Sequence, residues 1–266
     1  MKGWNYWGTR GESRFRAHLH SSIAYVLEEP ELAGVFNKDL EKKLLIFTTR
    51  VRRCDGKPFE AIDRARFFLK SATRKLPPAL KYLPRNYFED PVIFARNLPE
   101  ELRSEYVRPL TRRNCHAVIE ASCLVPVAMG KPLIPQDLQQ GSYPGDHHSV
   151  FMDGGYALKM PMRLFERDPR FQAVGEWAHA GKTIIFCCDP MGHLWETSAR
   201  LHRLNDLPSV MRAAGEDRLL VIHPDHKVEA GFLCVDHATT MRTFHRGQEQ
   251  AHRLLSSGKV RAFLQV

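Results

Sequence analysis

Apolar and polar residues follow one another along this chain in patterns that predict strands and helices in turn. Short apolar runs of strand length occupy four segments: 44–51, 149–152, 183–188 and 218–222. Apolar residues at helical spacing occupy four others: 61–76, 113–124, 198–214 and 235–255. The run at 183–188 is apolar throughout, as expected for a strand covered on both faces. Strands that alternate with helices predict an α/β fold in which helices flank a mostly parallel sheet.

The helix predicted at 61–76 has one apolar face and a defined end. The residues on that face are Ile62, Ala65, Phe68, Leu69 and Ala72. Pro77 and Pro78 end the helix. From there to residue 112 the chain is rich in proline and charge, which predicts an irregular excursion that serves as a lid or an insertion. No internal repeat or clear linker is found, so residues 1–266 are expected to form a single domain.

The composition narrows the class of protein. Apolar residues make up 43% of the chain and charged residues 26%, which is typical of a globular protein and excludes collagen and low-complexity disorder. No apolar run reaches the roughly 18–20 residues of a membrane-spanning helix. The first residues contain no apolar segment of the secretory type, so a cytoplasmic protein is expected. Six cysteines without a CxxC pair are expected to be buried free thiols in a reducing compartment.

Charge favours anionic partners. The chain has 39 basic and 30 acidic residues, a net charge of +9. Short basic clusters occur at Arg50, Arg52 and Arg53 and at Arg112–Arg113, and they are expected to lie on solvated faces. Aromatic residues between Phe67 and Phe88 lie among lysines and arginines. They are interpreted as core aromatics beside solvated charges, with stacking on single-stranded nucleic acid or docking on an anionic lipid surface as alternatives.

Three motifs carry the most information about function. The first is Ala121-Ser122-Cys123-Leu124-Val125-Pro126, at the end of a predicted helix. The second is Asp153-Gly154-Gly155, directly after a predicted strand, and the third is Pro161. In this order they resemble the second half of a patatin-like phospholipase domain of the bacterial type. The resemblance covers about residues 40–255, including the runs at 183–188 and 218–224 and the long helix that contains Gly247.

The resemblance implies a lipid acyl hydrolase that cleaves carboxylic esters with a serine–aspartate dyad. Asp153 matches the aspartate, which would accept the proton of the serine hydroxyl without a histidine. Gly154 and Gly155 would let the backbone turn tightly beside it. The implied substrate is a phospholipid or another acyl ester, with peripheral contact to an anionic membrane. No cofactor, metal or nucleic acid is expected, and the oligomeric state is left open.

The chain departs from the family at the nucleophile. Members of the family present the serine in a Gly-x-Ser-x-Gly turn between a strand and a helix. That string does not occur here, and the nearest one, around Ser13, lacks the second glycine and a preceding buried strand. Two interpretations follow. Either the chain lacks the N-terminal part of an active hydrolase, or it is a degenerate member, a non-catalytic module that binds lipid or protein.

One further cluster of residues is considered as a metal-binding site. Asp146, His147 and His148 lie shortly before Asp153, and histidines with carboxylates can bind zinc. Their spacing matches no closed zinc site, and Pro144-Gly145 indicates a turn. A surface loop is therefore the expected structure, in which a histidine could tune Asp153.

Overall fold

The structure is a computed structural model that describes most of the N-terminal half of the chain and parts of the remainder. The described residues are 14–37, 43–73, 78–80, 82–83, 85–125, 130–139, 143–156, 164–165, 168–178, 182–186, 219–222, 229 and 236–264. The chain divides into two compact units, Met1–Pro161 and Met162–Val266, and each is described by itself. Whether they form the single domain expected from the sequence stays a prediction.

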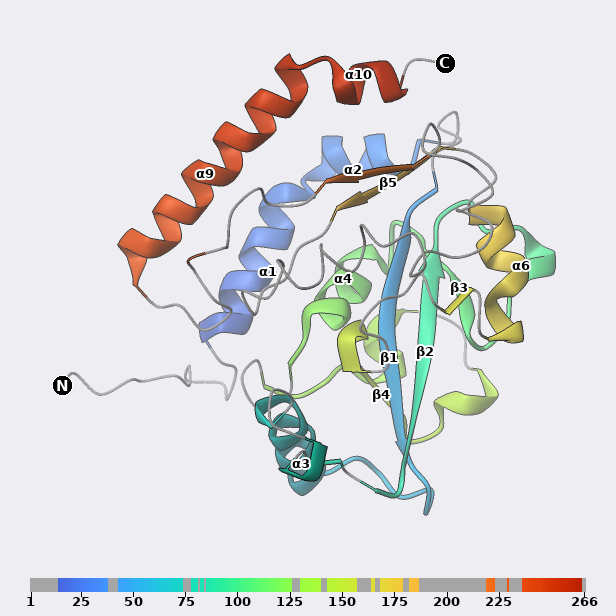
Figure 1. Ribbon diagram of the computed structural model, residues 1–266. Coiled ribbons are helices and arrows are strands. Elements are labelled where there is room, and N and C mark those ends of the chain that lie inside the picture. Colours follow the sequence, from blue (N-terminus) through green and yellow to red (C-terminus); the bar gives the residue numbers. More distant parts are fainter. Residues whose placement is uncertain are drawn as a thin grey trace. The chain divides into compact units, whose positions relative to one another are not determined.

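A four-stranded sheet organises the first unit (Figure 1). Its strand order is β3 (Val107–Pro109), β2 (Tyr87–Ala95), β1 (Leu45–Arg53) and β4 (Val150–Asp153). β1 pairs antiparallel with both β2 and β4, and β2 pairs parallel with β3. With helices in the same unit, the fold is of the α/β class, as the sequence predicted.

The prediction of a mostly parallel sheet is wrong for these four strands. A parallel neighbour of β1 would need a connection that crosses back along the sheet. Instead, the connection through α3 (Ala61–Ala72) lets β2 start opposite the end of β1, with Tyr87 facing Arg53. Residues 87–95 therefore form a central strand, not part of an irregular excursion, and Val92 to Ala95 are fully buried.

The helices of the first unit are α1 (Arg14–Val26), α2 (Glu29–Val35), α3 and α4 (Cys115–Cys123). Short 3-10 helices lie at Pro78–Leu80, Glu100–Leu102, Pro135–Leu138, Pro144–Asp146 and Gly154–Tyr156. α4 lies against β1 and β4, and α1 lies against α4 (Figure 1). The Nε of Arg16 on α1 donates a 2.6 Å hydrogen bond to the buried Glu120 on α4, which joins the two helices.

The face of α3 that lies against the sheet carries both apolar and charged residues. The ring of Phe67 is fully buried and lies 5.2 Å from the ring of Tyr87, in a cluster with Val51 and Met152. One turn earlier, Asp63 is also fully buried and accepts a hydrogen bond from the Tyr87 hydroxyl. The regular apolar face predicted for this helix points the other way. Its members Ile62, Ala65, Phe68 and Leu69 are exposed.

The second unit contains two strands and three helices among its described residues. They are α6 (Pro169–Ala178), β5 (Thr183–Phe186), β6 (Leu219–Ile222), α9 (His237–Ser256) and α10 (Lys259–Leu264). β5 and β6 pair in parallel, as predicted, and α9 confirms the long C-terminal helix. The helix predicted at 198–214 lies outside the described residues. In the part of the chain that is described, no helix is long and apolar enough to cross a membrane.

Candidate functional site

Asp153 ends β4 and begins a tight turn with the two glycines that follow. Its Oδ1 accepts a 2.6 Å hydrogen bond from the Gly155 N–H, so the carboxylate is folded back onto its own turn. Gly154 lies against β1, where a Cβ would come within 2.6 Å of the Phe47 carbonyl oxygen. Only glycine fits this approach, which explains why a glycine follows the aspartate.

Two neighbouring segments hold the backbone of this turn. The Thr49 hydroxyl on β1 donates to the Asp153 carbonyl at 2.8 Å and to the Gly154 carbonyl at 3.2 Å. From the other side, the Asp153 N–H donates to the Leu124 carbonyl at 3.0 Å, just after α4. The end of α4 and the Asp-Gly-Gly turn, two of the motifs that the sequence analysis selected, are therefore in direct contact.

The last turn of α4 brings a hydroxyl and a thiol into this region, and both are poor nucleophiles. The Ser122 hydroxyl donates to the Ile119 carbonyl at 2.8 Å within the helix. Cys123 is exposed, contrary to the expectation of buried thiols, and so is Cys54, whereas Cys115 is buried. Desolvation, and to a lesser extent the charge of Asp153, raises the pKa of Cys123, which disfavours the reactive thiolate.

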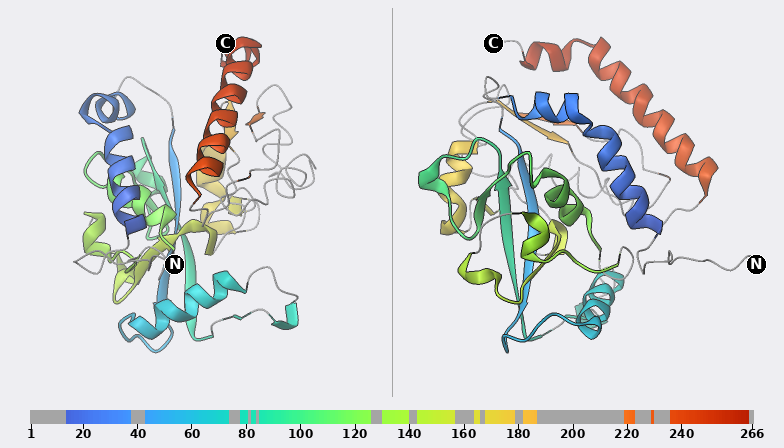
Figure 2. Two further views of the ribbon diagram at one scale, coloured as in Figure 1. Left: turned by 90° about the vertical axis from the view of Figure 1, so that its left-hand side faces the viewer. Right: turned by 180° about the vertical axis from the view of Figure 1, so that it is seen from behind.

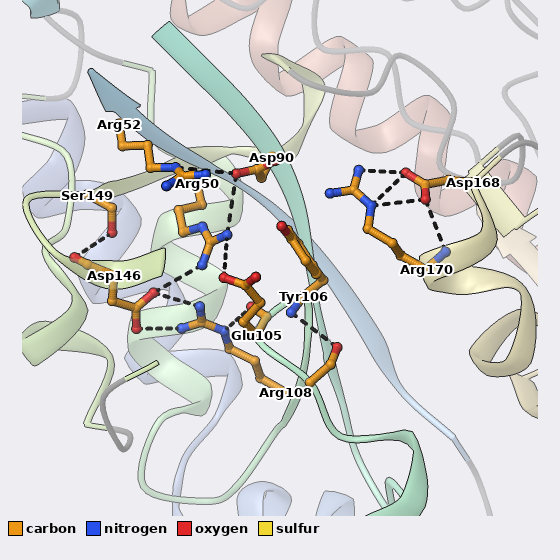
Figure 3. Close-up of polar contacts among 11 residues, drawn as sticks. Arg50, Arg52, Asp90, Glu105, Tyr106, Arg108, Asp146, Ser149, Asp168 and Arg170 are labelled. Atoms are coloured by element: carbon orange, nitrogen blue, oxygen red, sulfur yellow. Dashed lines mark hydrogen bonds and ion pairs between the residues drawn. The ribbon is translucent and has the colours of Figure 1, made fainter. Parts of the chain in front are cut away.

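A second constellation, one that the sequence analysis did not identify, is a buried ionic network (Figure 3). Arg50 on β1 and Arg108 on β3 are both fully buried. Arg108 forms a bidentate pair with Asp146, through hydrogen bonds of 2.6 Å and 2.9 Å. Arg50 contacts three carboxylates: Asp146 at 3.4 Å, Asp90 at 3.3 Å and Glu105 at 3.0 Å. These five residues are called the arginine network below.

The arginine network is tightly enclosed. The Tyr106 ring lies 5.1 Å from the Arg50 guanidinium carbon, and the Tyr143 ring 4.2 Å from that of Arg108. A Cβ on Gly145 would overlap the Arg50 guanidinium and the Glu105 carboxylate, so this position too requires glycine. Arg50 Nε is buried and makes no hydrogen bond to the residues that the structure describes.

The network changes the interpretation of the basic cluster and of Asp146. Arg50 was expected on a solvated face, yet it is inside the protein because carboxylates from three other segments surround it. Asp146 was considered as a metal ligand, but both of its oxygens bind arginine. His147 and His148 are exposed, as the loop prediction required. Among the described residues no group of three potential ligands could hold a metal ion.

A smaller polar cluster surrounds Asp63. Its carboxylate accepts hydrogen bonds from Tyr87, from Arg53 at 3.3 Å and from the Glu60 N–H at 2.8 Å. Burial alone would raise the pKa of Asp63, but these hydrogen bonds outweigh burial and hold the pKa below its ordinary value. Burial and the Asp63 bond raise the pKa of Tyr87. This cluster fixes α3 to the sheet.

Several residues selected from the sequence are not placed. Ser13, Pro126, Pro161 and Cys187 lie outside the described residues. The signal that could have revealed the arginine network was Arg50 itself, because a charged residue in the middle of an apolar strand needs a buried partner.

Comparisons with known proteins identify no relative, since no family model, no curated protein and no solved structure matches this chain.

Proposed function

We propose that this chain is a relative of the patatin-like phospholipases, a lipid acyl hydrolase in which Asp153 is the base of a serine–aspartate dyad. The observation that carries the proposal is the position of this carboxylate. It ends a strand, is partly exposed, and is fixed by the Gly155 N–H at 2.6 Å. A general base has to be held in this way, accessible to a substrate yet restricted in orientation.

The chemistry assigned to Asp153 is proton transfer. The serine oxygen attacks the acyl carbonyl carbon while its proton passes to the aspartate carboxylate. The protonated aspartate then gives the proton to the leaving alcohol, and water releases the acid in a second, equivalent step. The proposal assigns only the aspartate, because the 266 residues contain no Gly-x-Ser-x-Gly. The resemblance to the family rests on the order of the motifs and not on strand direction, since the four-stranded sheet is mostly antiparallel.

Labelling with a fluorophosphonate, combined with hydrolysis of a short-chain ester, tests this proposal. The wild-type chain should become labelled, and mass spectrometry of the labelled peptide identifies the serine. Asp153→Asn should reduce labelling and turnover by roughly a hundred-fold or more, because loss of a general base has that effect. Asp137→Asn is a matched control, since Asp137 also accepts one backbone N–H, from Ile134 at 2.9 Å. Equal turnover in wild type and Asp153→Asn contradicts the proposal.

A second candidate is a non-catalytic module that binds lipid or protein and keeps the Asp-Gly-Gly turn as structure. The absence of Gly-x-Ser-x-Gly from the sequence favours it. It predicts that a well-folded chain, verified by circular dichroism, shows no labelling by the fluorophosphonate. It also predicts binding to anionic vesicles that weakens as salt is added. Labelling of a single serine excludes this candidate.

A further inference from the structure

Helix α3 presents an apolar stripe to solvent on the side opposite its contact with the sheet. Asp63, Phe67 and Lys70 share the face toward β2, where Lys70 pairs with Glu89. A helix advances about 100° per residue, so Ile62, Ala65 and Leu69 fall on the opposite face. Figures 1 and 2 show α3 beside the end of β1 and the start of β2, away from α1 and α4. Neither of those two helices covers the stripe.

The segment after the helix carries further exposed apolar residues. The Tyr82 N–H donates to the Thr73 hydroxyl at 2.9 Å, which ties the following segment to the end of α3. That segment carries two more large exposed apolar side chains. The members of this α3 surface, with their exposed fractions, are Ile62 (53%), Phe68 (38%), Leu69 (44%), Leu80 (64%) and Leu83 (66%). Soluble proteins rarely expose apolar residues so closely together unless they bind a partner or a membrane.

The charge around this surface identifies the kind of partner. Between residues 61 and 88 the sequence has seven basic residues and one acidic residue, Asp63, and therefore carries +6 of the net +9. Asp63 is buried and pairs with Arg53 and, at 3.5 Å, with Arg66, while Lys70 pairs with Glu89 just beyond this segment. The excess positive charge therefore comes from Arg64 and the four basic residues that follow the helix. Arg64 and Arg66 lie on α3 itself, one on each side of the stripe. An apolar stripe flanked by arginines is the pattern of helices that lie in the interface of an anionic bilayer.

We propose that the α3 surface docks the protein on an anionic phospholipid bilayer. An anionic bilayer supplies both complements at once, acyl chains for the apolar stripe and phosphate groups for the arginines. A second copy of the chain would bring two surfaces of like charge together. Nucleic acid would match the charge, but its bases stack on aromatic rings, and four of the five exposed side chains are aliphatic. Docking would serve the proposed hydrolysis of lipid esters, and that purpose rests on the proposed function. Binding to the bilayer does not depend on it.

Co-sedimentation of the full chain with vesicles tests this surface. The chain should bind vesicles of equal parts phosphatidylcholine and phosphatidylserine, bind phosphatidylcholine alone at least ten-fold more weakly, and dissociate as salt is added. Leu69→Ser should weaken binding about ten-fold. The matched control is Ile134→Ser, because Ile134 is 45% exposed in the same unit but lies outside the α3 surface. It should change binding less than two-fold.

The electrostatic half is tested by a second matched pair. Arg64→Gln should weaken binding about five-fold, while Arg113→Gln, at an exposed position elsewhere, should have a smaller effect. Circular dichroism of every variant verifies folding. Three results overturn the proposal: equal binding by both members of each pair, tighter binding to single-stranded DNA than to anionic vesicles, or a dimer that Leu69→Ser dissociates.

The two proposals can fail separately. A chain that hydrolyses a water-soluble ester but ignores anionic vesicles retains the proposed hydrolase and overturns the docking surface. A chain that binds vesicles through Leu69 and Arg64 but never reacts with a fluorophosphonate retains the docking surface and overturns the proposed hydrolase. Because neither residue touches Asp153 in the described contacts, an active chain with Leu69→Ser should keep its turnover of the soluble ester.

Discussion

Asp146 and Asp153 lie seven residues apart, one before β4 and the other at its end, and their surroundings are opposite. Asp146 is buried, and both of its oxygens bind the guanidinium of Arg108. Asp153 is partly exposed and accepts a hydrogen bond from its own turn, at the Gly155 N–H. The same side chain therefore lies in two different environments along one short segment.

The difference shows why burial alone does not identify a functional carboxylate. A carboxylate that is held by two arginines in a closed space has no room for a substrate. A carboxylate at the end of a strand whose Oδ1 accepts a backbone N–H, as that of Asp153 does, keeps a defined orientation and partial access to solvent. We therefore assign a structural role to Asp146, while the chemical role of Asp153 stays a proposal, and variants of the two segments should respond in opposite ways.

The largest effect is expected from Asp146→Asn. The variant leaves Arg108 without its bidentate acceptor inside the protein, and breaking one partner of a buried ion pair costs about 3–5 kcal/mol. Urea unfolding monitored by circular dichroism measures the loss. As a control, the double variant Arg108→Met/Asp146→Asn should recover part of the stability, because the stranded charge is gone. A loss below about 1 kcal/mol for Asp146→Asn contradicts the structural role.

Gly145→Ala should have the next largest effect. Its Cβ would overlap the buried Arg50 and Glu105 side chains, and overpacking of this kind costs about 2 kcal/mol. Gly34 on α2 is the matched position, because a Cβ there meets nothing within 4 Å. Gly34→Ala should be neutral or slightly stabilising. Equal unfolding midpoints for the two variants would show that the network is looser than its contacts indicate.

A smaller, pH-dependent effect is expected from Glu105→Gln. Burial alone would raise the pKa of Glu105. The hydrogen bond and the charge of Arg50 have a larger, opposite effect, so the pKa of Glu105 in the folded protein is below its ordinary value. Such a group stabilises the fold at pH values above its unfolded pKa, and its contribution disappears as the pH falls through the lowered folded pKa.

Unfolding free energies at neutral and acidic pH measure this contribution. Glu105→Gln should lose about 1 kcal/mol or less at neutral pH, since Glu105 remains partly exposed, and the difference from wild type should vanish in acid. Glu101→Gln, at an exposed position nearby, serves as the control and should match wild type at both pH values. A difference that persists unchanged in acid argues against the ion pair with Arg50.

The sequence predicted what depends on local pattern. The apolar run at 44–51 became β1, and the run before Asp153 became β4, because short apolar runs of this length favour buried strands. α4 and α9 formed close to the predicted limits because apolar residues recur there at helical spacing. Periodicity does not encode the direction of pairing, so the antiparallel pairing of β1 with β2 could not be predicted from it. It also does not say which face of a helix meets the protein, so the exposed stripe of α3 could not be foreseen.

The arginine network could not be predicted because its members are distant in sequence. Arg50 meets Asp90, Glu105 and Asp146, which come from β2, from the segment just before β3 and from a 3-10 helix. No spacing rule connects such positions. The Asp-Gly-Gly turn, by contrast, was visible because three consecutive residues specify it, although its catalytic role stays a prediction.

The smallest change in stability is expected from Asp153→Asn, and this result would complete the comparison. The amide oxygen of asparagine can accept the Gly155 N–H as the carboxylate does, and Thr49 and Leu124 hold only backbone atoms, which the substitution leaves in place. The free energy of unfolding should therefore change by less than about 0.5 kcal/mol. Measured beside Asp146→Asn, which carries the same chemical change, this variant separates the two roles. A loss as large as that of Asp146→Asn would mean that Asp153 is a buried counter-ion like its neighbour, and that the fold, not a reaction, requires its charge.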